Sequence, residues 1–285
     1  MKASRIVLVD ALRGFALAGV ALVHMGEQYL GGPAPDGLLE AANQGWLDSL
    51  ISGFIGLFFF GKFFALFSIL FGFSFYLQMK LAEDRGESFG GRFLWRAFWL
   101  LVFGLIHQCF YKGDILFIYA TLVPVLLPFY RIQTKWVLAV AVLCFLSLGK
   151  VISFAIWGDQ PIFGEFNFMD GNHPAYVANV ELLRNGGSFW EIAQVNLTQG
   201  MGHKMDFQLS FFGRYYYTFG YFLMGMLIGR IQLFREVDRF LPYRKKAIWV
   251  SVLLLVGGVA LLIPSFAMAG QPPDFSRWSA MLGMN

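Results

Sequence analysis

The feature that most constrains this chain is a series of long apolar runs without the polar interruptions of a soluble fold. Hydrophobic residues make up 57% of its 285 residues and charged residues only 14%, whereas soluble domains contain about 25% charged residues. A helix that crosses a bilayer needs about 20 consecutive apolar residues. Backbone groups in lipid must form hydrogen bonds within their own segment, so these runs are predicted to be helices. We therefore expect an all-α, polytopic integral membrane helix bundle.

The apolar runs predict about seven spans. Their approximate ranges are 7–28, 50–79, 95–111, 115–130, 136–157, 211–229 and 247–268. The second run is too long, because as one helix it would measure about 45 Å against a hydrocarbon core of about 30 Å. Gly61 and Lys62 mark the natural break. We expect a re-entrant or interfacial piece before them and the span itself over Phe63–Met79.

The distribution of Lys and Arg predicts which ends of the spans face the cytoplasm. With the N-terminus inside, most basic residues fall in inner segments and few in outer ones, as the positive-inside rule requires. The net charge of +4 then reflects topology and gives no reason to expect nucleic acid as a partner. We expect a multi-pass protein of the bacterial cytoplasmic (inner) membrane, with the lipid bilayer as its main partner.

One polar insert, at about 158–210, interrupts the apolar pattern and should lie on the extracytoplasmic side. It contains two helical patterns, near 174–184 and 188–199. Ser188 precedes Glu191 by three residues, which is the spacing of a capping box at a helix N-terminus. We expect the insert to fold as a cap on a single transmembrane domain that takes in all 285 residues.

Ionisable residues inside the predicted spans are the candidates for function, because such groups are costly in a membrane. Arg13 and His24 are 11 residues apart, so they share one helix face and lie about 16 Å apart along the axis. Arg96 and His107 repeat this spacing on a helix that runs in the same direction. If both faces line one cavity, its inner end would attract an anion and its outer end would offer imidazoles for acid–base chemistry.

The first and third spans also allow a purely structural interpretation. Asp10 lies three residues before Arg13, so the two can form a self-neutralising pair on the helix surface. His24 and His107 can be interfacial histidines that form hydrogen bonds with a neighbouring helix.

Other polar residues have structural alternatives too. Asp114 follows a glycine and opens an apolar run, which is typical of a helix N-cap. Lys62 can extend its amine to the membrane surface, and Arg96 can be a positive-inside anchor. His173 and His203 lack the spacing of metal ligands, so we expect no metal site.

Three separated motifs carry a resemblance to a known family. They are Asp10-Ala-Leu-Arg13-Gly14, the stretch from Phe60-Gly61-Lys62 to Phe71-Gly72, and Gly104-Leu-Ile-His107 followed by Gly113-Asp114. In this order they resemble the YeiB-like bacterial membrane family (domain of unknown function 418), over most of residues 5–230. That family has no established activity, so its name alone implies no reaction.

The family is similar to a wider group of transmembrane acyltransferases, which includes the acyltransferase 3 family and heparan-alpha-glucosaminide N-acetyltransferase. This resemblance implies an acyltransferase that uses cytosolic acyl-CoA, with acetyl-CoA the expected donor. The acyl group would pass to an extracytoplasmic sugar, lipid or small-molecule acceptor. His24 stands where those enzymes have a histidine, which makes it the candidate base, and Arg13 is the candidate donor-site residue.

The candidate site combines this resemblance with the helical spacing. The catalytic candidates are His24, His107 and Asp114. The candidates for binding acyl-CoA are Arg13, Arg96 and Lys62, which would neutralise its phosphates, and Asp10, which would position Arg13.

Two features depart from the family pattern. Asn is usual at the position of His24, and an acidic residue is common at that of Phe60, so His24 resembles the O-acyltransferases more than the YeiB-like proteins. Family members also continue with further spans beyond the seventh, and we expect these C-terminal spans to be absent here.

Two other classes of function stay open. A transporter or lipid-handling protein could bind and pass a substrate with the same polar residues, and the break at Gly61 would suit it. No inverted repeat supports that alternative. In a membrane scaffold the polar residues would only pack helices. Gly225 and Gly229 form a GxxxG step that favours close helix packing, and a homodimer is left open.

Overall fold

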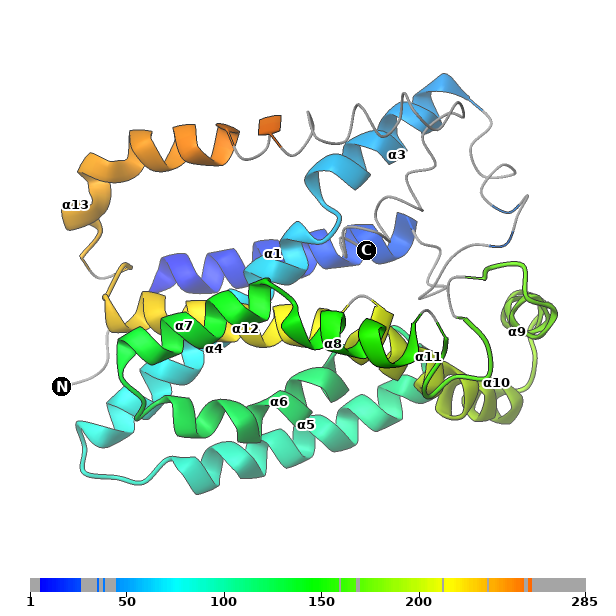
Figure 1. Cartoon of the computed structure of the whole chain (residues 1–285), viewed down its shortest axis with the longest axis horizontal. Coiled ribbons are helices and arrows are strands. Elements are labelled where there is room, and N and C mark those ends of the chain that lie inside the picture. Colours follow the sequence, from blue (N-terminus) through cyan, green and yellow to red (C-terminus); the bar gives the residue numbers. More distant parts are fainter. Residues whose placement is uncertain are drawn as a thin grey trace.

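The computed structural model describes residues 6–26, 35, 38, 45–158, 160–167, 170–211, 213–234, 236–253 and 256–257. Within these ranges every regular element is a helix (Figure 1). The all-α prediction is thus confirmed for the described residues. The predicted span over 247–268 lies mostly outside them.

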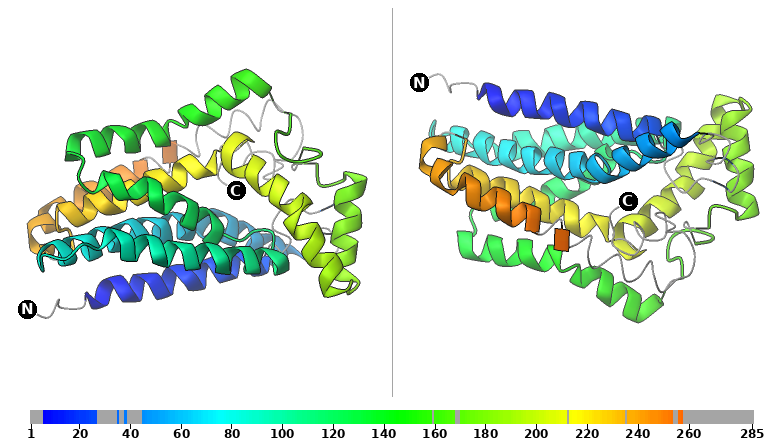
Figure 2. Two further views of the ribbon diagram at one scale, coloured as in Figure 1. Left: turned by 90° about the horizontal axis from the view of Figure 1, so that it is seen from below. Right: turned by 90° about the horizontal axis from the view of Figure 1, so that it is seen from above.

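The helices form a bundle with a cap at one end. Running along the long axis are α1 (Val7–Gly26), α3 (Trp46–Phe58), α4 (Lys62–Glu83), α5 (Gly90–Phe110), α6 (Leu116–Phe129), α7 (Thr134–Phe145), α8 (Leu148–Trp157) and α12 (Arg214–Arg230). The cap consists of α9 (Pro174–Arg184), α10 (Phe189–Leu197) and α11 (Gln199–Asp206), and a π-helical turn (Phe207–Phe211) leads from it to α12. A short α13 (Val237–Phe240) and a 3-10 turn (Leu241–Tyr243) follow α12. Figure 2 shows the cap at the end opposite the N-terminus.

Within the described residues, three stretches are long and apolar enough to cross a membrane: Val7–Gly26, Trp46–Glu83 and Gly90–Phe110. The pair α7 and α8 makes a fourth if its bend of 42° lies within one span. The predicted spans at 115–130 and 211–229 correspond to α6, with 14 residues, and α12, with 17 residues. Both are shorter than the roughly 20 residues of an average span.

Two of the predicted long runs are broken in the structure. The break expected at Gly61 and Lys62 is confirmed, because Gly61 has a φ of 71° and separates α3 from α4. The run over 136–157, predicted as one helix, is interrupted at Ser147, whose φ is 51°. Ser147 is neither glycine nor next to a proline, so the sequence carries no helix-breaking signal there.

The bundle core forms where α12 crosses α4. Phe222, Leu223 and Met226 of α12 are fully buried, together with Phe73 and Leu70 of α4. In contrast, large apolar side chains are exposed around the outside of the bundle. Examples are Trp95, Phe103, Trp136, Phe154 and Leu17. An apolar exterior around an apolar core is what a lipid environment requires.

Close approach of the two central helices depends on glycine. A Cβ atom on Gly225 would lie 1.9 Å from the carbonyl oxygen of Ile69, and one on Gly72 would lie 2.0 Å from that of Phe222. The predicted GxxxG step therefore packs α12 against α4 of the same chain. Small residues permit such backbone contact between membrane helices.

Polar contacts tie together the bundle end that holds the N-terminus. Tyr130 donates to Glu83 at 2.7 Å, which joins the turns after α6 and α4. Arg230, at the end of α12, donates to the carbonyl oxygens of Phe129 and Tyr130 at 2.9 Å. The turns that the basic residues predict to be cytoplasmic are thus neighbours in space.

The cap follows its sequence pattern closely. Both predicted helices are present as α9 and α10, whereas α11 was not predicted. The capping box is confirmed, since the Ser188 N–H donates to Glu191 Oε2 at 2.9 Å and the Glu191 N–H to Ser188 Oγ at 3.4 Å. The Asp206 carboxylate accepts three backbone N–H groups from 162–164 and thereby fixes the loop before α9.

We predict that Gly225→Ala destabilises the protein, because the added methyl group must push α4 and α12 apart. Overpacking of this kind costs about 1–3 kcal/mol. Gly53→Ala is the matched control, since Gly53 is also helical and a Cβ there meets nothing within 4 Å. Thermal unfolding of the detergent-solubilised variants should show a lower Tm for Gly225→Ala alone. Equal Tm values would contradict the packing described above.

Candidate functional site

A cavity of about 340 Å³ lies between α1, α4, α5 and α6, towards the end that holds the N-terminus. Arg13 of α1 and Arg96 of α5 both line it, which meets the condition set above for these two residues. The other lining residues are Phe67, Leu70, Phe71, Ser74, Phe75 and Gln78 of α4, Phe93, Ala97 and Leu100 of α5, and Val123 of α6. The cavity thus pairs two guanidinium groups with largely aromatic and aliphatic walls, and its volume falls at the lower end of small-molecule pockets.

Each arginine is held by a polar side chain of α4. Arg13 donates to Ser74 Oγ, and Arg96 donates to Gln78 Oε1 at 2.6 Å. Ser74 and Gln78 are four residues apart, so they lie on one face of α4. Arg13 also forms an ion pair with Asp10 at 2.9 Å. That contact agrees both with a positioning role for Asp10 and with a self-neutralising surface pair.

The two candidate histidines each contact Tyr111, at the cap end of the bundle. The Tyr111 hydroxyl and His24 Nδ1 are 2.9 Å apart and share a hydrogen bond. The ring of Tyr111 lies 5.2 Å from the ring of His24 and 5.9 Å from that of His107, between centroids. Tyr111 follows α5 and therefore links the cap ends of α1 and α5. The four predicted side chains thus form two separate pairs, because neither histidine lines the arginine cavity.

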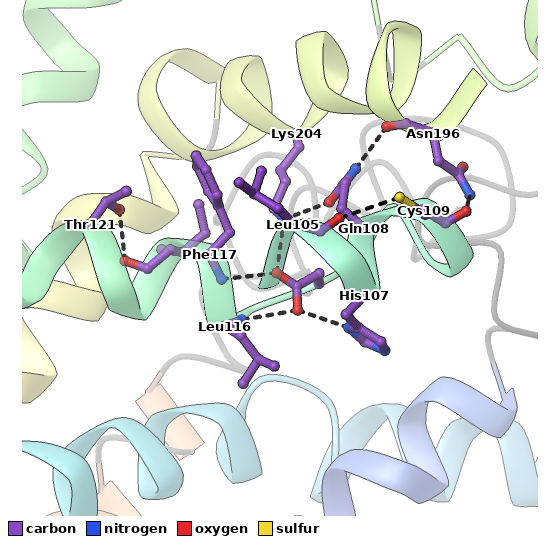
Figure 3. A network of polar contacts seen from close by, with 11 residues as sticks. Leu105, His107, Gln108, Cys109, Leu116, Phe117, Thr121, Asn196 and Lys204 are labelled. Atoms are coloured by element: carbon purple, nitrogen blue, oxygen red, sulfur yellow. Dashed lines mark hydrogen bonds and ion pairs between the residues drawn. The ribbon is translucent and has the colours of Figure 1, made fainter. Parts of the chain in front are cut away.

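Asp114 orients His107 and also caps α6. Its side chain is fully buried, and Oδ1 lies 2.8 Å from His107 Nδ1. The carboxylate accepts the backbone N–H groups of Leu116 at 3.1 Å and Phe117 at 2.9 Å, so the predicted capping role is confirmed. Oδ2 also forms an ion pair with Lys204 Nζ at 3.3 Å. Figure 3 labels four partners of this carboxylate: His107, Leu116, Phe117 and Lys204.

Lys204 inserts from the cap into the α5–α6 turn. Its Nζ donates to Gln108 Oε1 at 2.7 Å, and Gln108 Nε2 in turn donates to the carbonyl oxygen of Asn196 at 2.9 Å. Asn196 Nδ2 donates back to the carbonyl oxygen of Cys109 at 3.0 Å. These contacts, visible in Figure 3, attach α10 and α11 to the end of α5.

The sequence did not identify Tyr111, Gln108, Asn196 or Lys204 as site residues. Gln108 could have been recognised from the sequence, because it is an amide within an apolar run and stands beside His107. Lys204 carries no local signal, because its partner Asp114 is 90 residues away.

Burial shifts the pKa values of the basic groups in and near the cap. It lowers the pKa of Lys204, and the neighbouring Asp114 opposes that shift. Burial lowers the pKa of Lys112 to about 7; its Nζ lies 4.0 Å from the centroid of the Tyr176 ring. Burial and the charge of Lys112 lower the pKa of His203 to about 4. Of these groups, Lys204 is the one whose buried charge is balanced by an ion pair within the described residues.

Lys62 lies apart from both pairs. It begins α4, where its Nζ is 3.5 Å from the carbonyl oxygen of Gly56, and it does not line the arginine cavity. Ser74 and Gln78 lie 12 and 16 residues further along α4, which places Lys62 about 18–24 Å from the arginines along the helix axis. Its expected role beside Arg13 and Arg96 therefore has no geometric support. Among the described residues no group of three or more His, Cys, Asp and Glu side chains could hold a metal ion.

Comparisons with known proteins give a relative that is itself uncharacterised. No family model matches the chain, and no solved structure matches it. The chain is 38% identical over 133 residues to an uncharacterised 39.9 kDa protein in an amylase 3′ region of Bacillus acidopullulyticus. The aligned part covers 46% of this chain and 36% of the relative. This similarity therefore carries no activity over to the chain.

We predict that Lys204→Met strongly destabilises the protein, because it leaves the Asp114 carboxylate buried without its counter-charge. Breaking one side of a buried ion pair costs about 3–5 kcal/mol. The double variant Lys204→Met with Asp114→Asn should recover most of this loss, since Asn caps helices about as well as Asp. Lys135→Met, at an exposed lysine, is the control. Thermal unfolding checks the series, and a double variant no more stable than Lys204→Met would refute the charge argument.

Proposed function

We propose that the protein is a multi-pass transmembrane acyltransferase of the bacterial cytoplasmic membrane, related to the YeiB-like family. In this proposal it crosses the bilayer about seven times, with the N-terminus in the cytoplasm and the cap outside. The clustering of the turns after α4, α6 and α12 at one end supports this orientation, because those turns hold the basic residues Arg85, Arg131 and Arg230. Such an excess marks the cytoplasmic side.

Cytosolic acyl-CoA is the proposed donor, and the arginine cavity is its proposed entry. Arg13 and Arg96 offer two permanent cations to phosphate groups, and the cavity that they line lies towards the predicted cytoplasmic end of the bundle. Asp10 and Ser74 hold Arg13 in place, while Gln78 holds Arg96. Acetyl-CoA remains the expected member of this donor class.

The histidine pair is the proposed site of transfer. One imidazole takes the proton of an acceptor hydroxyl or amine, whose oxygen or nitrogen attacks the thioester carbonyl carbon. The new ester or amide bond forms as the carbon–sulfur bond breaks, and the imidazolium returns its proton to the CoA thiolate. His107 suits the role of base, since the Asp114 carboxylate can orient its Nδ1–H and stabilise the imidazolium. His24, held by Tyr111, would position the acceptor or share the proton.

The observation that carries the proposal is the matched arrangement on α1 and α5. Each helix places an arginine in the cavity at one end and a histidine beside Tyr111 at the other. A donor bound at the arginines and extended towards the histidines would meet an acceptor from the opposite side. That geometry suits transfer of a group across the membrane.

A transporter or lipid-handling protein is the second candidate. The observation that favours it is the pair of breaks, at Gly61 between α3 and α4 and at Ser147 between α7 and α8. Transporters place substrate and ion sites at such discontinuous helices. Here, however, neither break contributes a residue to the arginine cavity.

The test is acyl-CoA binding and turnover by the purified protein in nanodiscs. We expect Arg13→Ala and Arg96→Ala each to weaken acyl-CoA binding about 10- to 100-fold, as the loss of a charged hydrogen bond predicts. His107→Ala should lower turnover by about 10²–10⁴ without that loss of binding, and His24→Ala should also lower turnover. Arg92→Ala is the matched control, because Arg92 is exposed and pairs with Glu87.

Either of two results would remove the enzyme proposal. One is that the wild-type protein neither binds nor consumes any acyl-CoA, which would move transport to first place. The other is that turnover survives in both His107→Ala and His24→Ala.

A further inference from the structure

The outer end of α5 has two faces of different character. Gln108 is fully buried under the cap, with its amide bonded to Asn196. His107, the preceding residue, has half of its side chain exposed. Phe103 and Phe110 lie four residues before and three after His107, so they share its face, and they are 58% and 60% exposed. The exposed imidazole therefore opens towards a surface that is apolar on both sides of it.

In the proposed orientation, both histidines lie at the depth where lipid headgroups begin. His24 is two residues from the end of α1, and His107 is three residues from the end of α5, or about 3–5 Å from the helix ends. A helix of 20 residues, the length of α1, spans the hydrocarbon core of about 30 Å. The two imidazoles thus lie near the boundary between core and headgroups.

The cap reaches the same level with exposed aromatic side chains. Phe189 and Trp190 open α10 and are 43% and 78% exposed. The rings of Phe189 and Phe110 are 5.2 Å apart, so the aromatic surface of α10 continues that of α5. We call Phe103, Phe110, Phe189 and Trp190 the aromatic patch. Trp and other aromatic residues gather at this level of membrane proteins because it is apolar on one side and wet on the other.

These contacts restrict how an acceptor reaches the imidazole. The cap covers the Gln108 face of α5, while the His107 face borders the aromatic patch and the lipid. Building on the acyltransferase function proposed above, we infer that the acceptor is a membrane amphiphile of the outer leaflet. It presents a headgroup hydroxyl or amine to His107 and His24 from within the bilayer. The aromatic patch binds its glycerol or upper acyl region, and a freely soluble acceptor lacks that contact.

The experiment compares matched acceptors in proteoliposomes. Phosphatidylethanolamine and phosphatidylglycerol serve as membrane acceptors, with free ethanolamine and free glycerol as soluble counterparts, and acyl-labelled acetyl-CoA and octanoyl-CoA as donors. We expect at least about tenfold more label in the lipid fraction than in water-soluble product, as a contact worth about 1.4 kcal/mol predicts. CoA release with label only in soluble product, or shared equally, would overturn the inference while the enzyme proposal stands. Absence of CoA release with every pair would remove the enzyme proposal and the inference with it.

A pair of tryptophan variants tests the aromatic patch itself. Trp190→Ser should raise the KM for the lipid acceptor about tenfold, because it removes most of an exposed interfacial ring. Trp136→Ser is the matched control, since Trp136 is 60% exposed on α7, away from the cap. Equal KM values for the two variants would show that the patch does not bind the acceptor.

Discussion

The candidate site depends on the contacts that the buried carboxylate of Asp114 makes. One side chain caps α6, holds His107 and anchors Lys204 of the cap. A buried carboxylate is costly unless its oxygens are fully paired, so the three partners are needed together. The α5–α6 turn, the cap and the orientation of His107 are therefore parts of one arrangement.

The sequence predicted the elements well wherever composition alone decides them. Apolar runs predicted the positions of α1, α4 and α5. Gly61 predicted the break before α4, where the backbone has a φ of 71° that glycine adopts without strain. The bend at Ser147 was not predicted, since Ser rarely adopts the conformation that it has here.

Part of the candidate site follows from residue spacing within single helices, and part depends on contacts between segments that are far apart in the sequence. Helical periodicity is local, and it put Arg13 and His24 on one face of α1 and Arg96 and His107 on one face of α5. Only the structure shows that Arg13 and Arg96 line one cavity and that both histidines contact Tyr111. Periodicity could not show that the arginines and histidines form two groups, nor that Lys62 belongs to neither. Lys204 and Asn196 come from a part of the chain that is distant from α5 in sequence, and only the folded cap brings them to Gln108.

The packing of α1 has a consequence for motion. Among the long helices, α4 and α12 are locked backbone to backbone at Gly72 and Gly225, whereas α1 packs mainly on α4 and touches α3 only lightly. In the described part of the chain, we therefore expect displacement of α1 to break fewer contacts than displacement of the central pair. Such a displacement would carry Arg13 and His24 together, because they lie on one rigid helix. One movement of α1 would then change both the width of the arginine cavity and the hydrogen bond between His24 and Tyr111.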